Sequence, residues 1–170
     1  MLNYVEYLYD LARELDCGLR LAPNLDGMMY VEFGYVEGPH PDTSHDRYTP
    51  QQAFAVGLHE LGHFHHGHTQ GRPPFLEETE YFNRGVLRSE AEAWDYALHH
   101  LQICEEMGFP LQDNTRAFMW GRCLNSYFSS AQRLAGRPTR LGNGDRGYVV
   151  FVFDEPGALF NEVRDRLVAA

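Results

Sequence analysis

The chain has 170 residues and a formal net charge of −10, and 44% of its residues are hydrophobic. This length suits one compact domain over residues 1–170, and the apolar share excludes wholesale disorder. The negative charge disfavours direct nucleic-acid binding, and no basic recognition helix is evident. No apolar run approaches the roughly 20 residues of a bilayer-spanning helix, and the first residues lack a signal-peptide pattern. We therefore expect a cytoplasmic protein that does not bind a membrane.

The first third of the chain predicts a helix followed by short strands. Apolar residues at three- and four-residue steps indicate a helix over residues 3–16. Aromatic and β-branched stretches at 18–21 and 28–36, separated by turn residues, predict two or three strands, most simply antiparallel. Glycines and prolines then indicate a loop over 37–48.

The second helix has clear start and stop signals. Thr49 as the cap, Pro50 in the first helical position and Gln52 three residues after the cap form a capping-box pattern. Gly67 is placed to end the helix. The sequence therefore predicts a helix from residue 50 to about residue 66.

The remaining segments predict further helices and one buried strand. We expect a helix over 86–107, a helix capped by Asp113 or Asn114 that reaches about residue 134, a strand over 147–153 and a helix from residue 156 to about residue 168. The expected fold class is α+β, with a small antiparallel sheet packed on the second helix and additional helices completing the core.

The second helix carries the motif His59-Glu60-Leu-Gly-His63. Histidines four residues apart on a helix project from the same face and can share one cation. Zinc held in this way lowers the pKa of a bound water toward about 7, and Glu60 is placed to accept its proton. The motif therefore predicts a zinc-dependent hydrolase, with His59 and His63 as metal ligands and Glu60 as the catalytic base.

This motif has a simpler interpretation, because it lies in a histidine-rich run in which a match can arise by chance. The capped helix, and the glycines at positions 57 and 62, favour the metal site: a helix-interior glycine costs about 1 kcal/mol relative to alanine and so suggests a need for close approach. The metzincin pattern is excluded, because Thr69 stands where its third histidine belongs.

A catalytic zinc usually takes three protein ligands, and a carboxylate on the third helix is the best source of the third. Two glutamates compete for this role. Glu90 falls at the centre of the apolar face that contains Trp94, whereas Glu92 lies near the edge of that face beside Tyr96. Glu92 also fits a capping box with Ser89, in which it would only stabilise the start of the helix.

The order of these motifs resembles the ImmA/IrrE family of metallopeptidases, especially its short phage-encoded members. The resemblance is carried by His59-Glu-Leu-Gly-His63, by Gly67-His68, and by Glu90-x-Glu92-Ala93-x-x-Tyr96-Ala97-x-x-x-Leu101. It covers a core of about 1–107 and leaves 108–170 as an extension of unknown role.

The resemblance implies a zincin-like domain of the minimal gluzincin type. It implies zinc bound by His59, His63 and Glu92, with Glu60 as general base. The implied activity is cleavage of a regulatory protein, such as the transcriptional repressor of a phage or mobile element.

A second hypothesis is a non-catalytic regulatory binding protein that sequesters a repressor on the same scaffold. Its motivation is that no group that would stabilise a transition state can be named from the sequence, although His66, His99 and Tyr96 are candidates. The segment 28–36 is attractive as an edge that pairs with an extended peptide.

Overall fold

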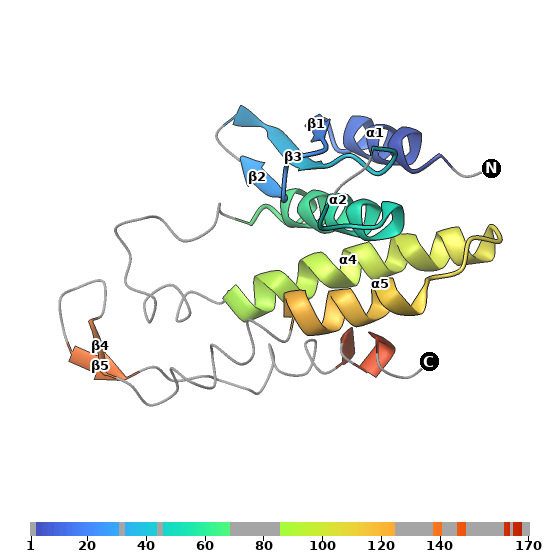
Figure 1. Cartoon of the computed structure of the whole chain (residues 1–170). Helices are drawn as coiled ribbons and strands as arrows, with labels where there is room; N and C mark the ends of the chain where they lie inside the picture. Colours follow the sequence, from blue (N-terminus) through green and yellow to red (C-terminus); the bar gives the residue numbers. More distant parts are fainter. Residues whose placement is uncertain are drawn as a thin grey trace.

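The computed structural model describes residues 3–30, 33–43, 46–68, 86–124, 138–140, 146–148, 162–163 and 165–167. It shows a mixed α+β fold, in agreement with the expected fold class. Figure 1 shows three layers, in which helix α2 lies between the small sheet with α1 on one side and α4 with α5 on the other.

Helix α1 (Tyr4–Glu14) begins at Asn3, whose side chain accepts hydrogen bonds from the backbone N–H groups of Val5 and Glu6. This cap satisfies two of the N–H groups that a helix start leaves without an intrahelical partner. The face of α1 that carries Leu8 and Leu11 is buried. The prediction of a helix over 3–16 is confirmed, with bounds shifted by one or two residues.

The sheet contains β1 (Gly18–Ala22), β2 (Met28–Tyr30) and β3 (Tyr35–Pro39) in the spatial order β1-β3-β2. Strands β2 and β3 are antiparallel, but β1 and β3 are parallel, with Gly18 opposite Tyr35 and Ala22 opposite Pro39. The prediction of an antiparallel sheet is therefore wrong for one of its two strand pairs.

The composition of residues 28–36 also suits one continuous strand, but the structure divides this segment between β2 and β3. Gly34 has a positive φ of 63°, a conformation that favours glycine, and the chain reverses so that β2 and β3 pair with each other. Strand β3 then continues to Pro39, into the segment expected to be a loop.

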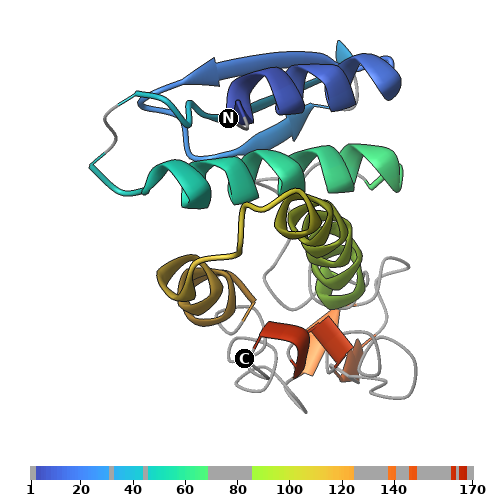
Figure 2. The same cartoon turned by 90° about the vertical axis from the view of Figure 1, so that its right-hand side faces the viewer.

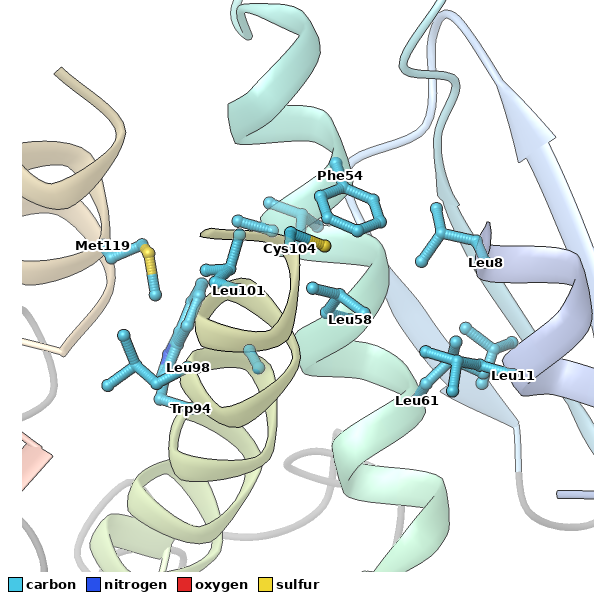
Figure 3. Close-up of a cluster of buried hydrophobic side chains, with 14 of the residues drawn as sticks. Leu8, Leu11, Phe54, Leu58, Leu61, Trp94, Leu98, Leu101, Cys104 and Met119 are labelled. Carbon is cyan, nitrogen blue, oxygen red and sulfur yellow. The ribbon is translucent and has the colours of Figure 1, made fainter. Parts of the chain in front are cut away.

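Helix α2 (Pro50–His65) forms with the predicted capping box, in which Thr49 and Gln52 exchange side-chain and backbone hydrogen bonds. It packs against β2, β3 and α1 on one side and against α4 (Val86–Glu106) on the other. A helix covered on two sides must be apolar around most of its circumference. The fully buried Phe54, Leu58 and Leu61 satisfy this requirement (Figure 3).

Helix α4 matches its predicted range and packs its buried face against α2, which lies between α4 and the sheet (Figure 2). Trp94, Leu101 and Cys104 from this face join the core between the two helices (Figure 3). Each large side chain buried in this way contributes about 1.5–3 kcal/mol. Among the described elements, the interface between α2 and α4 is the main packing contact, and the predicted metal motif lies along it.

The later predicted elements are described only in part, and residues 125–134 of the predicted fourth helix lie outside the described residues. Helix α5 (Asp113–Phe118) continues into the π-helical turn η2 (Met119–Leu124), and its N-cap is Gln112 with no side-chain cap bond, so the expected cap by Asp113 or Asn114 is wrong. Strands β4 (Pro138–Arg140) and β5 (Arg146–Tyr148) form an antiparallel pair, so the predicted strand is described only at its start. The rest of that strand, and most of the closing helix, lie outside the described residues.

Among the helices that the structure describes, none is both long enough and apolar enough to cross a bilayer.

Candidate metal centre

The imidazoles of His59 and His63 face each other on α2, with their Nε2 atoms 3.0 Å apart. Successive turns of one helix produce this arrangement, because residues four apart lie on the same face. His59 is buried and its ring stacks on Trp94 of α4, with ring centroids 4.2 Å apart. The predicted pairing of the two imidazoles is confirmed.

The carboxylate that joins them is Glu90 of α4. Its two oxygens lie 3.4 Å from Nε2 of His59 and 3.5 Å from Nε2 of His63. The ligand atoms of these three residues all lie within 4.8 Å of one another. Glu90 is only 6% exposed, so its carboxylate is largely removed from water.

The assignment of Glu92 as the third residue of this cluster is corrected by the geometry. Glu92 lies at the margin of the buried face, where it accepts hydrogen bonds from Arg88 at 2.7 Å and from His68 at 2.8 Å. The capping-box alternative is also wrong, because α4 begins at Val86 and Ser89 is already inside the helix.

The physical reason for the correction is the helical periodicity of α4. Glu90 lies one helical turn before Trp94, on the face of α4 that packs against α2. Glu92 comes two residues later, so its side chain leaves the helix in a different direction, away from the centre of this face. The helical periodicity of α4 therefore predicts the buried carboxylate correctly, whereas the sequence register of the family resemblance does not.

The three residues suit a divalent metal ion in both chemistry and spacing. Imidazole nitrogens and a carboxylate oxygen are typical zinc ligands, with bonds of about 2.0–2.2 Å. Two such bonds at a tetrahedral angle place their donor atoms roughly 3.3 Å apart. The observed separations of 3.0, 3.4 and 3.5 Å are close to this value. A buried carboxylate also requires a cationic partner.

Electrostatics at the cluster favour the ionised carboxylate. Burial opposes ionisation of Glu90, but the adjacent imidazoles of His59 and His63 outweigh this effect and lower the pKa of Glu90 to about 2. Burial and the neighbouring His63 lower the pKa of His59 to about 4, although Glu90 acts in the opposite direction. A neutral His59 beside an ionised Glu90 is the protonation state that metal coordination needs.

Glu60 lies next to the cluster but is not part of it. Burial raises its pKa to about 7; the charge of His63 acts to lower this pKa and that of Glu90 to raise it. Gly27, the residue before β2, packs closely against the Glu60 side chain, since a Cβ added to Gly27 would lie 2.9 Å from Glu60 Oε1. A carboxylate with a pKa near 7 is well matched to proton transfer at neutral pH.

The other candidate residues lie away from the three ligand atoms. The exposed His66 stacks on His68, while Tyr96 contacts the rings of His65 and His100. His99 is exposed and contacts His100. None of these contacts directs the side chain toward the His59, His63 and Glu90 cluster.

Sequence reasoning missed the role of His68 in this neighbourhood. His68 lies beside His63, with their Nδ1 atoms 2.9 Å apart. The signal was available, because a glycine that ends a helix in a left-handed conformation turns the next residue back toward the last turn.

In the comparisons with known proteins, no family model, no curated protein and no solved structure matches the chain.

Proposed function

We propose that the protein is a zinc-dependent peptidase that hydrolyses a peptide bond at the His59, His63 and Glu90 cluster. The observation that carries the proposal is the convergence of three ligand atoms within 4.8 Å, from the buried His59 and Glu90 and the half-buried His63, next to a glutamate with a pKa of about 7. A structural zinc site would need a fourth protein donor, and the described residues bring only three together here.

In this proposal, His59, His63 and Glu90 hold the zinc ion through two nitrogens and one oxygen. Zinc bound there supplies Lewis acidity, which activates water and polarises the substrate carbonyl. The chain itself supplies the proton acceptor. Glu60 takes a proton from the attacking water and returns it to the amine that leaves, so the carboxylate is regenerated after each cycle.

The sheet supports a peptide as the substrate. Strand β2 is at the edge of the described sheet, and Gly27, the residue before it, leaves no room for a Cβ beside Glu60. Met28 is 47% exposed on this strand and Phe33 is 72% exposed just after it. An extended peptide aligned along β2 would use backbone hydrogen bonds for affinity and these apolar side chains for contact. Its scissile bond would then pass beside Glu60.

The resemblance to the ImmA/IrrE family extends this proposal to the substrate class. We propose a regulatory protein, such as a transcriptional repressor, as the cleaved partner. A single specific cleavage, rather than general digestion, would be the expected product pattern.

The test is to compare Glu60→Gln with the parent protein, each loaded with zinc. Both proteins are incubated with a library of peptides from a digested bacterial proteome, and new termini are identified by mass spectrometry. Parent protein should hold about one zinc and produce new termini with a defined sequence preference. Glu60→Gln should hold the same zinc but produce no new termini, because the proton acceptor is lost.

A matched control is Glu105→Gln, which removes an exposed carboxylate on α4 and should leave both measurements unchanged. A Glu60→Gln variant as active as the parent would refute the mechanism. If neither protein cleaves any peptide, but both bind a repressor and zinc, the binding-protein hypothesis replaces the peptidase.

A further inference from the structure

Helix α2 ends in a turn that brings His68 beside His63. Gly67 has a positive φ of 64°, and its backbone N–H donates to the carbonyl of Phe64 at 3.0 Å. The backbone N–H of His68 donates to the carbonyl of His63, also at 3.0 Å. This pair of bonds is the Schellman motif, which requires a left-handed residue at the position of Gly67. The turn thus places His68 beside the last turn of α2, which carries the candidate ligand His63.

A continuous set of hydrogen bonds runs from His63 to the surface of α4. His63 Nδ1 is 2.9 Å from His68 Nδ1, and His68 Nε2 is 2.8 Å from Glu92 Oε2. The other Glu92 oxygen accepts from Arg88 Nε at 2.7 Å. The side chain of His68 is 10% exposed and that of Glu92 is 20% exposed, so the contact between these two residues is largely shielded from water.

With neutral rings, the chemistry of the groups fixes where the protons lie. A guanidinium only donates and an ionised carboxylate only accepts, so Nε2 of His68 must carry the proton that Glu92 accepts. The Nδ1 atom of neutral His68 is then an acceptor, and Nδ1 of His63 must be its donor. This leaves the lone pair of His63 on Nε2, the atom that faces Glu90 and His59.

From this geometry we propose that His68 is a positioning residue for the metal centre. It holds the His63 ring in the orientation and tautomer that present Nε2 to a cation, and Glu92 with Arg88 holds His68 in turn. The inference rests on the proposed metal site and assigns Glu92 a supporting role behind a ligand. Partners of this kind orient ligating imidazoles and increase their basicity.

His59 shows the contrast within the same centre. Its Nδ1 atom is buried and has no hydrogen-bond partner in the described part of the chain, and its ring is held by stacking on Trp94. The two imidazoles are therefore fixed by different means, one by packing and one by hydrogen bonds. Loss of His68 should affect only the second.

The experiment measures zinc affinity of the full chain by competition with a chromogenic chelator. His68→Leu removes the acceptor for His63 and should weaken zinc binding by about 10–100-fold, the usual effect of losing such a partner. His68→Asn supplies a carbonyl oxygen near the position of Nδ1 and should recover part of the loss. His65→Leu, the same substitution at an exposed histidine of α2, should match the parent.

Two further measurements separate positioning from a general effect on folding. Urea unfolding of the zinc-free proteins should give His68→Leu and His68→Asn similar free energies of unfolding, so that stability does not explain their different affinities. Nitrogen NMR of the zinc-free parent at alkaline pH should show His63 protonated on Nδ1 and His68 on Nε2. In His68→Leu, the His63 ring should shift toward a mixture of tautomers.

The outcomes distinguish this inference from the proposed function. If the parent binds one zinc and Glu90→Gln abolishes binding, but His68→Leu binds as tightly as the parent, the positioning role is overturned and the metal site stands. If Glu92→Gln loses as much affinity as Glu90→Gln, Glu92 is itself a ligand and the inference is also overturned. A parent that binds no zinc overturns the proposed function.

Discussion

Replacing Gly62 by alanine tests whether the close approach of α2 and α4 assembles the metal centre. A Cβ at this position would lie 2.7 Å from the carbonyl oxygen of Ala93 and 3.0 Å from its Cα. Both atoms belong to the backbone of α4, so no side-chain rotation can relieve the clash. Restoring an ordinary contact of 3.4 Å to the oxygen would separate the helices by about 0.7 Å.

The expected effect on stability is modest, and the expected effect on metal binding is large. Overpacking of a well-packed interface costs about 1–3 kcal/mol. Alanine regains about 1 kcal/mol of helix propensity over glycine, so the net loss should be about 0–2 kcal/mol. The separation also moves Glu90 away from His59 and His63, and metal–ligand bonds tolerate only about 0.2 Å. Zinc affinity should fall by about ten-fold or more.

The assay pairs urea unfolding of the zinc-free protein with chelator competition for zinc. Gly57→Ala is the matched control, because it gains the same helix propensity but its Cβ would meet only the side chain of Leu8, with the nearest atom at 2.8 Å. Gly57→Ala should lose stability but bind zinc as tightly as the parent. A Gly62→Ala protein that binds zinc as tightly as the parent would show that the spacing of α2 and α4 does not set the site.

Three other predictions follow from individual contacts. Hydrolysis should decrease toward acid pH, because Glu60 accepts a proton only as the carboxylate, and burial raises its pKa to about 7. A bound cation lowers this pKa, so the acid limb of the zinc-loaded protein should lie below about pH 7. A pH–rate profile without an acid limb at any pH at which zinc stays bound contradicts the assignment. Gly27→Ala should reduce both cleavage and stability. Gly27 has a φ of 143°, which disfavours alanine, and the added Cβ would press on Glu60. Cleavage kinetics and urea unfolding would measure the two effects. Gln51→Leu should destabilise the fold by about 1–3 kcal/mol in urea unfolding. The buried Gln51 amide donates a hydrogen bond to the carbonyl of Pro110 at 3.0 Å and accepts one from the backbone N–H of Gln112 at 2.8 Å, and leucine can form neither. An unchanged midpoint would show that water replaces these bonds.

Features with local causes were predictable from the sequence. The capping box at Thr49 and the terminating Gly67 depend on residues within one helical turn, and both ends of α2 were found where the pattern placed them. The pairing of His59 with His63 follows from the same helix geometry. The motif could therefore be located before any tertiary structure was known.

Features that depend on distant partners were not predictable in the same way. Strands β1 and β3 pair in parallel, and the composition of these two segments does not indicate their order in the sheet. The hairpin within 28–36 depends on the conformation at Gly34, and the same residues also suit one longer strand. A short apolar segment predicts a strand, and the neighbours of that strand in space decide how it pairs.

For the third member of the cluster, two criteria applied to the sequence pointed to different residues. The helical wheel placed Glu90 on the buried face of α4, and the family register pointed to Glu92. The structure brings Glu90 to the imidazoles and uses Glu92 to hold His68. Burial on a packed face was the more direct physical criterion, because a metal centre between two helices can only be completed from that face.

The stacking of His59 on Trp94 gives the protein an optical reporter of its own metal centre. The chain has two tryptophans, and Trp94 is in ring contact with a proposed ligand at 4.2 Å. Copper or cobalt bound to His59 would quench the fluorescence of this indole by short-range energy or electron transfer, whereas zinc would leave it bright. In a Trp120→Phe background, emission at a single wavelength would report occupancy in real time, without any added dye.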